Sequence, residues 1–343
     1  MKFWIGLIIF MIGLPAVNGF CQSMSVDEMK SFSFYYENDV VAGTDKNYSN
    51  AIKFAWISAD LDEYDALGNL TPDKSTFWGK LLSREGFQRN VGISFGQNMY
   101  TPEDKDTKEL IKDDRPYAGL TYLGFSLHRK NEKILDTIEL NIGIVGPDSL
   151  AEDGQKLVHE ITGSSIPKGW DNQLNNEFGF SLTLQRSRRL VSRHIDTGWG
   201  WDLVPHAGIT AGTFAVYANA GAGFRFGYHV PADFGNALAR PGENVSVPVG
   251  RSGNRTSRWH RFSITAFLSI EGRAVARNIF LDGNTFTDSH SVDKKPFVGD
   301  FSSGLSINYK TFKLTYAHVY RSPEFEEQDK GHTFGSLSLS YIY

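Results

Sequence analysis

The sequence predicts an all-β protein, a twelve-stranded antiparallel transmembrane β-barrel with a short helix in an extracellular loop. Three observations predict this fold. Apolar residues alternate with small or polar residues from residue 31 to the last residue, the segments that alternate are even in number, and the last segment ends on aromatic residues. A composition of 13% aromatic residues with 34 glycines also favours an all-β protein.

The alternation is clearest in residues 137–144, 178–185 and 304–309. In each of these segments every second residue is apolar and the residues between are small or polar, which is typical of a strand with one apolar face. A soluble sandwich and a membrane barrel share this pattern, since the apolar face turns inward in one and outward in the other.

Twelve segments alternate in this way, and bacterial single-chain barrels have an even number of strands. The predicted strands are 30–38, 48–58, 89–99, 119–129, 134–145, 177–188, 199–211, 214–228, 260–278, 299–310, 312–320 and 333–343. The last of them carries Leu337, Leu339, Tyr341 and Tyr343 and resembles the assembly signal of outer-membrane barrels. Together with the N-terminal segment, this favours a membrane barrel over a periplasmic sandwich.

Residues 1–22 are predicted to be a secretory signal peptide, because Lys2 precedes an apolar core that runs from Phe3 to Val17. Residues 23–343 then form the barrel. No later apolar run approaches the roughly 20 residues of a membrane helix. The single cysteine, Cys21, excludes an internal disulfide and a thiolate metal site. A net charge of −4 does not favour nucleic acid as a partner.

An even barrel with both chain ends in the periplasm places alternate connections on opposite sides of the membrane. The predicted outward loops are 39–47, 100–118, 146–176, 212–213, 279–298 and 321–332. The long segments 59–88 and 229–259 are then periplasmic, although periplasmic turns are usually short.

The loop 146–176 is predicted to contain a helix that lies over the barrel mouth. Ser149 and Glu152 have capping-box spacing, an apolar stripe follows at Leu150, Leu157, Val158 and Ile161, and Gly163 is a C-terminal stop signal. Gln155 and His159 are four residues apart and share a face of this helix. A histidine near its neutral pKa is a natural general base, although a single histidine on a helix is more often structural or solvated.

Polar residues also gather where the first outward loop begins and ends. Asn38 and Asp39 end the first strand, and Ser49 lies at the start of the second. If alternation continues, Asp39 and Ser49 point to the lumen and Asn38 points to the wall. Loop solvation with an Asx turn is the simpler interpretation of this pattern.

Four sequence blocks together resemble the lipid A 3′-O-deacylase family, in order and over nearly the whole mature chain. They are Glu37-Asn38-Asp39 with Thr44-Asp45 and Tyr48-Ser49-Asn50, then Asp114-Arg115-Pro116-Tyr117-Ala118-Gly119, then Gly143-Ile144-Val145-Gly146-Pro147, and Pro167-Lys168-Gly169-Trp170-Asp171-Asn172-Gln173-Leu174. The resemblance also implies a twelve-stranded outer-membrane barrel.

The resemblance implies that the chain hydrolyses the 3′ ester-linked acyloxyacyl chain of lipid A, with calcium as cofactor and with the site facing the cell exterior. His159 matches the catalytic histidine, Gln155 the glutamine one turn earlier, and Ser49 the hydroxyl residue of the second strand. Asn38 and Asp39 match the pair that binds calcium or orients the base. A branch of the family has a glutamate six residues after the histidine, where this chain has Ser165; Asp171, Glu160 or Asp45 are candidates to compensate.

The chemistry expected from the resemblance agrees with the residues present. Ester hydrolysis needs a base and a positive charge or donors where the oxyanion develops. Arg115 and Lys168, on outward loops, are candidate ligands of lipid A phosphates, with loop packing as the alternative. Trp170 and Tyr117 are equally candidates for an interfacial aromatic belt.

Two other function classes remain open for a barrel with this sequence. A narrow transport pore is one, and a structural barrel whose catalytic site has decayed is the other. The oligomeric state is not determined by the sequence.

Overall fold

The structure is a computed structural model that describes residues 30–39, 50–61, 86–162, 167–195, 197–235 and 262–343. The predicted signal peptide, most of the two long segments assigned to the periplasm, and Asp45, Ser49 and Ser165 lie outside these residues. None of the helices within them is long and apolar enough to cross a bilayer.

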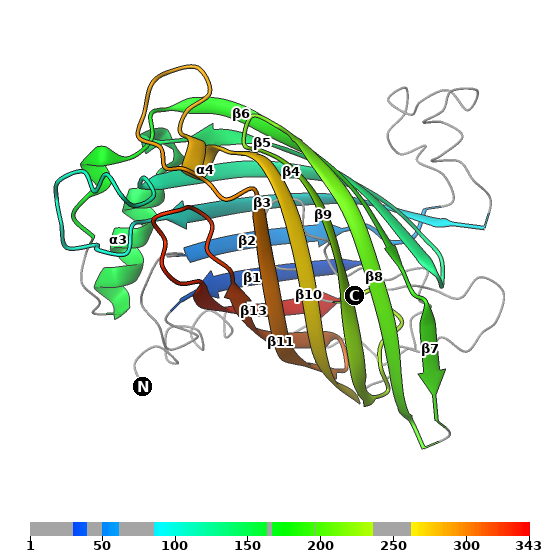
Figure 1. The fold of residues 1–343 in the computed structure, drawn as a ribbon. Coiled ribbons are helices and arrows are strands. Elements are labelled where there is room, and N and C mark those ends of the chain that lie inside the picture. Colours follow the sequence, from blue (N-terminus) through cyan, green and yellow to red (C-terminus); the bar gives the residue numbers. More distant parts are fainter. Residues whose placement is uncertain (1–29, 40–49, 62–85, 163–166, 196, 236–261) are drawn as a thin grey trace, which may run out of the picture.

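Thirteen strands are present in the described residues (Figure 1). They are β1 (Ser31–Asn38), β2 (Asn50–Ile57), β3 (Gln88–Tyr100), β4 (Ala118–Lys130), β5 (Ile134–Val145), β6 (Glu177–Arg188), β7 (Val191–His194), β8 (Trp199–Gly212), β9 (Ala215–Tyr228), β10 (Phe262–Asn278), β11 (Phe297–Tyr309), β12 (Phe312–Arg321) and β13 (His332–Ile342). Twelve of them match the twelve predicted strands, with most ends within one or two residues.

The strands form a closed antiparallel barrel. Strands that follow one another in sequence pair, except that β6 pairs with β8 and not with β7, and β1 pairs with β13. The short strand β7 was not predicted. It continues β6 along β8 with the register shifted by one residue, since Ser187 pairs with His206 whereas Val191 pairs with Leu203. The break falls in an arginine-rich stretch where the alternation stops, so no sequence pattern indicated a further strand there.

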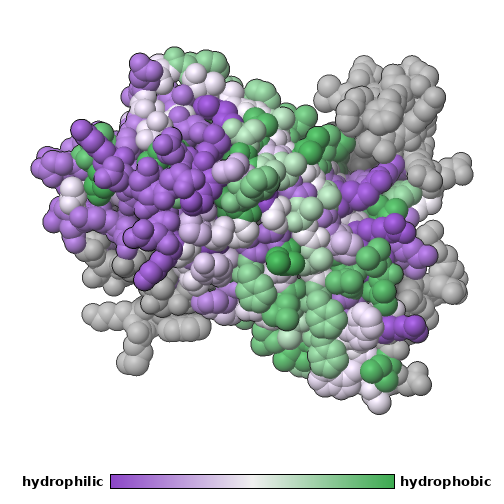
Figure 2. Space-filling model, in the orientation of Figure 1, coloured by the Kyte–Doolittle hydropathy of each residue, from purple (hydrophilic) through white to green (hydrophobic). Residues whose placement is uncertain are grey.

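The outer wall of the barrel carries a belt of exposed apolar side chains. They occupy every second position along the strands, among them Phe32, Ile93, Phe95, Leu123, Phe125, Phe180, Leu268, Ile270, Phe301, Leu305 and Leu314. Figure 2 shows hydrophobic residues over the strands and hydrophilic residues gathered at one end. Exposed apolar residues in a continuous band are the lipid-facing surface of a membrane barrel.

The inward-facing positions are polar, and many are buried. Lys53 and Glu139 pair across the lumen at 3.8 Å, and Arg225 pairs with Asp202. Buried charges are stable when they are paired with opposite charges. Ion pairs across the lumen do not favour the open pore that a transport function requires.

The two ends of the barrel differ. The end that we call the helical rim carries α3 (Ala151–Thr162), α4 (Ile279–Asp282) and two 3₁₀ turns, η4 (Pro147–Ser149) and η5 (Trp170–Asn172). The opposite end has tight turns such as the one at Lys310, and the C-terminus lies at that end (Figure 1). The described parts of all the longer loops predicted to face outward therefore meet at the helical rim.

Candidate active site

Helix α3 lies against the outer wall of the barrel, not over its mouth as predicted. The carbonyl oxygen of Ser149, just before the helix, accepts hydrogen bonds from Gln97 Nε2 at 2.8 Å and from Thr121 Oγ1 at 2.7 Å. Gln97 is two residues from the exposed Phe95 in β3, and Thr121 is two residues from the exposed Leu123 in β4, so all four side chains lie on the same face of the sheet. The helix therefore occupies the face that points away from the lumen.

Glycine allows this close approach. A Cβ atom at Gly119 of β4 would lie 2.2 Å from the Cβ of Ala151 and 2.3 Å from Ser149 Oγ. Gly146, where the chain leaves β5 for the helix, has a φ of 99°, which side chains other than glycine rarely adopt. The Gly143–Pro147 block therefore directs α3 onto the wall.

The predicted capping box is wrong. Ser149 ends the 3₁₀ turn η4, and Leu150 follows it in the left-handed conformation with a φ of 55°. Ser149 Oγ is buried with no hydrogen-bond partner in the described residues, and Glu152 pairs with Lys156 instead. The break at Leu150 separates Ser149 from the helix that it was predicted to cap.

Gln155 is a buried anchor of the helix. Its Oε1 accepts a hydrogen bond of 2.8 Å from Trp170 Nε1, and its Nε2 is buried with no partner in the described residues. Since Trp170 can only donate, this bond identifies the amide oxygen. Gln155 has 0% exposure, so its side chain meets the protein rather than solvent.

Trp170 and Tyr117 pack together beside Gln155, with ring centroids 5.1 Å apart. Together with Met99 and Ala151 they form a buried group that we call the rim cluster. Their exposures of 2% and 3% contradict the interpretation of these two residues as an interfacial belt. Burial raises the pKa of Tyr117 to about 12, so its phenol is neutral.

The strand register places Asn38 on the same outer wall as α3. Glu37 pairs with Ala51, so the next pair is Asn38 with Asn50, and Asn50 in turn pairs with Met99 of the rim cluster. Neighbouring strands lie about 4.8 Å apart, so Asn38 and Met99 are about 10 Å apart along this row. This register agrees with the prediction that the side chain of Asn38 faces the outer side of the barrel wall and not the lumen.

Asp39 follows Asn38 at the helical rim and is almost fully buried. Lys105 Nζ lies 3.8 Å from Asp39 Oδ2. The carbonyl oxygen of Lys105 accepts a hydrogen bond of 2.9 Å from the backbone N–H of Lys168. Lys105 therefore joins the end of β1 to the two loops that carry the rim cluster and α3, a contact that no sequence pattern indicated.

The structure thus brings Asn38, Asp39 and Gln155 to one sector of the helical rim. His159 is one turn beyond Gln155 on α3 and is partly exposed. Among the described residues, no group of three or more histidine, cysteine, aspartate or glutamate side chains forms a ready metal site. Of the candidates to compensate for Ser165, Glu160 is exposed, and Asp171 is exposed and 3.8 Å from Lys108.

The two cations predicted to bind phosphate differ in accessibility. Lys168 is exposed on the rim, 3.6 Å from an exposed Asp106. Arg115 is 1% exposed, and its Nη2 donates to Glu324 Oε2 at 2.6 Å. Burial alone would raise the pKa of Glu324, but the charges of Arg115 and Arg321 outweigh it and lower the pKa well below its usual range. Arg115 would have to leave this pair to reach a phosphate.

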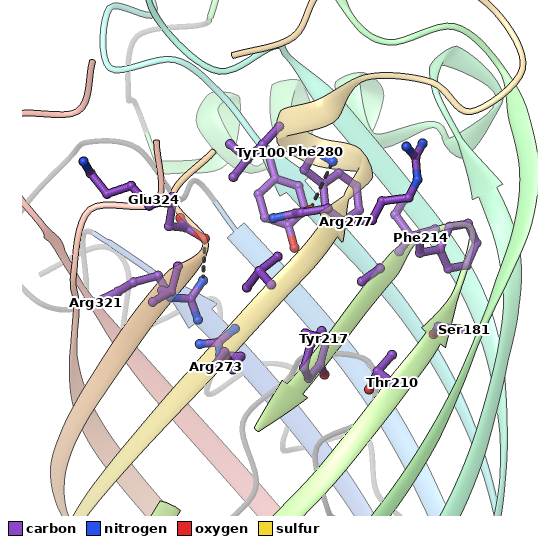
Figure 3. Close-up of a pocket in the computed structure, with 17 residues that line it drawn as sticks. Tyr100, Ser181, Thr210, Phe214, Tyr217, Arg273, Arg277, Phe280, Arg321 and Glu324 are labelled. Atoms are coloured by element: carbon purple, nitrogen blue, oxygen red, sulfur yellow. Dashed lines mark hydrogen bonds and ion pairs between the residues drawn. The ribbon is translucent and has the colours of Figure 1, made fainter. Parts of the chain in front are cut away.

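A separate cavity of about 90 Å³ lies on the lumen side of the wall (Figure 3). Tyr100 and Leu120 line it, and they follow Met99 and Gly119 in sequence, so their side chains point to the opposite face from α3. Arg273, Arg321 and Glu324 line it as well, and Asp300 bridges the two arginines. The barrel wall therefore separates this cavity from the groups around α3.

A closed barrel with an apolar outer belt, polar rims and a polar site on its lipid-facing wall defines an outer-membrane β-barrel protein. The chain belongs to the family described as outer membrane protein LpxR, whose match spans residues 3–343. This membership confirms the resemblance to the lipid A 3′-O-deacylase family.

One solved structure supports the fold. LpxR from Salmonella typhimurium is similar with a TM-score of 0.71 and 17% sequence identity, over 91% of this chain and 100% of that one. The β-domain of the Bordetella autotransporter BrkA gives 0.40 and 9%, over 92% and 97%. A bacterial polysaccharide outer membrane secretin gives 0.36 and 8%, over 93% and 100%. No curated protein matches the chain.

Proposed function

We propose that this chain is an outer-membrane esterase that removes the 3′-linked acyloxyacyl chain of lipid A, with the helical rim facing the cell exterior. The observation that carries the proposal is the position of α3 on the lipid-facing wall. The helix packs there on Met99, which is in the same row of paired residues across the strands as Asn38. A lipid in the outer leaflet can reach this wall laterally, without entering the lumen. Membership of the LpxR family supports the same substrate class.

His159 is the proposed general base, which takes a proton from the attacking water as that water adds to the ester carbonyl. The ester C–O bond then breaks, and the protonated imidazole returns the proton to the sugar oxygen that leaves. His159 is partly exposed on α3, as a group that meets both water and substrate must be. Gln155 is buried, so we assign it a positioning role: through Trp170 it fixes the turn of α3 that precedes His159. Ser49, the remaining residue implied by the resemblance, stays a prediction.

The side chains at the end of β1 carry oxygen atoms of the type that bind a hard cation. Asn38 and Asp39 offer amide and carboxylate oxygens, and the buried Asn50 Oδ1 has no hydrogen-bond partner in the described residues. Calcium prefers such oxygen ligands. Bound there, calcium would supply positive charge for the developing oxyanion. Lys105, 3.8 Å from Asp39, opposes binding, since its charge competes for the same carboxylate.

Mass spectrometry of lipid A tests the proposal. Cells that express the chain should contain lipid A that lacks the 3′ acyloxyacyl chain, and cells without it should not. An unchanged acyl pattern in cells whose outer membrane contains the folded barrel contradicts the proposed activity and would favour a decayed site.

Removal of divalent cations tests the cofactor. A chelator should abolish deacylation by the purified protein, and added calcium should restore it. The Asp39→Asn variant should need about tenfold more calcium for half-maximal activity, because ligand charge sets affinity at such sites. The Lys105→Met variant should shift the requirement in the opposite direction. Activity that is unaffected by chelation excludes the calcium-assisted mechanism.

The Trp170→Phe variant tests the anchor of α3. It keeps an aromatic ring but leaves Gln155 Oε1 buried without its donor, which costs about 1–3 kcal/mol. We expect the catalytic rate to fall about tenfold while the barrel stays folded, a change that corresponds to about 1.4 kcal/mol. The matched control is Trp199→Phe on the lipid-facing wall.

A double variant separates positioning from direct contact with substrate. In Trp170→Phe/Gln155→Met both polar partners become apolar, which removes the unsatisfied group. Recovery of activity shows that Gln155 acts through the position of α3. Activity that stays lost, with the stability of the barrel restored, means that Gln155 itself touches the substrate.

A further inference from the structure

Helix α3 presents two leucines that nothing in the described part of the protein covers, between the exposed acids Asp153 and Glu160 and the face that contacts the barrel. Leu157 in its middle is 58% exposed, and Leu150 at its start is 62% exposed. We call these two residues the leucine flank. Leu150 and Leu157 of the predicted apolar stripe are exposed, and small Ala151 and polar Gln155 face the wall.

Helix geometry shows which way Leu157 points. Successive residues are rotated by about 100°, so Leu157 lies about 60° around the helix from Gly154, on the side away from Gln155. Gly154 and Gln155 lie at the two edges of the helix face that contacts the barrel. Leu157 lies beyond the edge at Gly154.

The neighbours of these two residues orient the helix relative to the membrane. A Cβ atom on Gly154 would lie 2.8 Å from Gln97 Oε1 and 3.1 Å from Met99 Cε. Gln97 is two residues from Phe95, which belongs to the apolar belt. Gln155 instead contacts Trp170 in the loop above the strands. The Gly154 side therefore faces the belt, and the Gln155 side faces the rim.

We infer that the leucine flank lies among the acyl chains of the outer leaflet, so that α3 acts as an interfacial helix that continues the lipid-facing belt upward. Exposed leucines next to the belt gain free energy when lipid covers them. Glu152 and Lys156, which form an ion pair, each lie about 160° around the helix from Gly154 and therefore on the side away from the belt. Under the proposed function, the same acyl chains belong to the substrate.

Site-specific fluorescence tests the placement in a way that does not depend on activity. A Leu157→Cys variant, with Cys21 replaced by serine, is labelled with a small polarity-sensitive dye and folded into phosphatidylcholine vesicles. Phosphatidylcholine brominated along its acyl chains should quench most of this fluorescence, and aqueous iodide should quench little. The matched control is Lys156→Cys, about 100° around the helix from Leu157 and on the side away from Gly154, which should show the reverse.

Two outcomes overturn the inference. Equal quenching by iodide at both positions means that the leucine flank stands in water. Disulfide-linked dimers of the Leu157→Cys variant, with no quenching by brominated lipid, mean that a second copy covers it.

A Leu150→Ser/Leu157→Ser variant connects the surface with the proposed function. Loss of the lipid contact should lower deacylation of lipid A in vesicles about tenfold, because two leucines lose part of their burial in lipid. Activity on lipid A dispersed in detergent should change little. Equal loss in both assays contradicts a role in engaging the bilayer. If no variant shows activity but the quenching pattern holds, the proposed function fails and the placement of α3 stands.

Discussion

The His159→Ala variant should lose lipid A deacylation by about 10²–10⁴-fold, the usual contribution of a general base. His159 is one turn beyond Gln155 on α3, and no other described histidine lies on this helix. The loss should appear in the catalytic rate, measured by mass spectrometry of lipid A after incubation with purified protein in vesicles.

Folding is not expected to suffer from this change. His159 is partly exposed, and surface substitutions alter stability by about 0.5 kcal/mol or less. The variant should therefore keep the heat-modifiable migration of a folded barrel. His318→Ala, on the lipid-facing side of β12, is the matched control and should retain full activity. Deacylation that persists in the His159→Ala variant would exclude His159 as the base.

The Asp233→Asn variant should lose about 3–5 kcal/mol of stability, the cost of removing one partner from a buried ion pair. Asp233 accepts a hydrogen bond of 2.6 Å from Lys313 of β12, and it also pairs with Arg225 of β9. All three side chains are at least 95% buried. Neutralising Asp233 leaves the buried cations Arg225 and Lys313 with less negative charge beside them. Urea unfolding of the protein in vesicles measures the loss.

The same group predicts how stability depends on pH. Burial alone would raise the pKa of Asp233, but the charges of Lys313 and Arg225 outweigh it and lower the pKa far below its usual range. A carboxyl with a folded pKa below its unfolded value stabilises fully above about pH 4, and this contribution is lost as pH falls. The wild-type protein should therefore lose stability in acid faster than Asp233→Asn. Asp329→Asn, an exposed carboxyl, is the matched control.

Most of the barrel could be predicted because strand formation follows a local pattern of period two. The pattern in 137–144 or 304–309 identifies both the strand and its apolar face within a few residues. Strand β7 was missed because its alternation is interrupted by arginines, and the pairing that defines it comes from β8, which follows it in the chain.

The candidate site was predicted less completely. His159 and Gln155 could be placed on a helix from spacing alone, and Asn38 and Asp39 at the end of a strand. Trp170 and Lys105 were not assigned their roles, because each acts through a residue in a different segment. For Arg115 the sequence left phosphate binding and loop packing open, because its partner Glu324 lies 209 residues away in sequence.

The sequence by itself determined twelve of the strands, the apolar face of each and the family, since these depend on residues close together in the chain or on long matching blocks. Only the tertiary structure decided that α3 lies on the outer wall. That position depends on the fit of Ala151 and Gly154 against Gly119, Gln97 and Met99. Such a fit is a property of surfaces that meet after folding. The same contacts bury Gln155 and leave the leucines exposed, the opposite of what their hydrophobicity alone predicts.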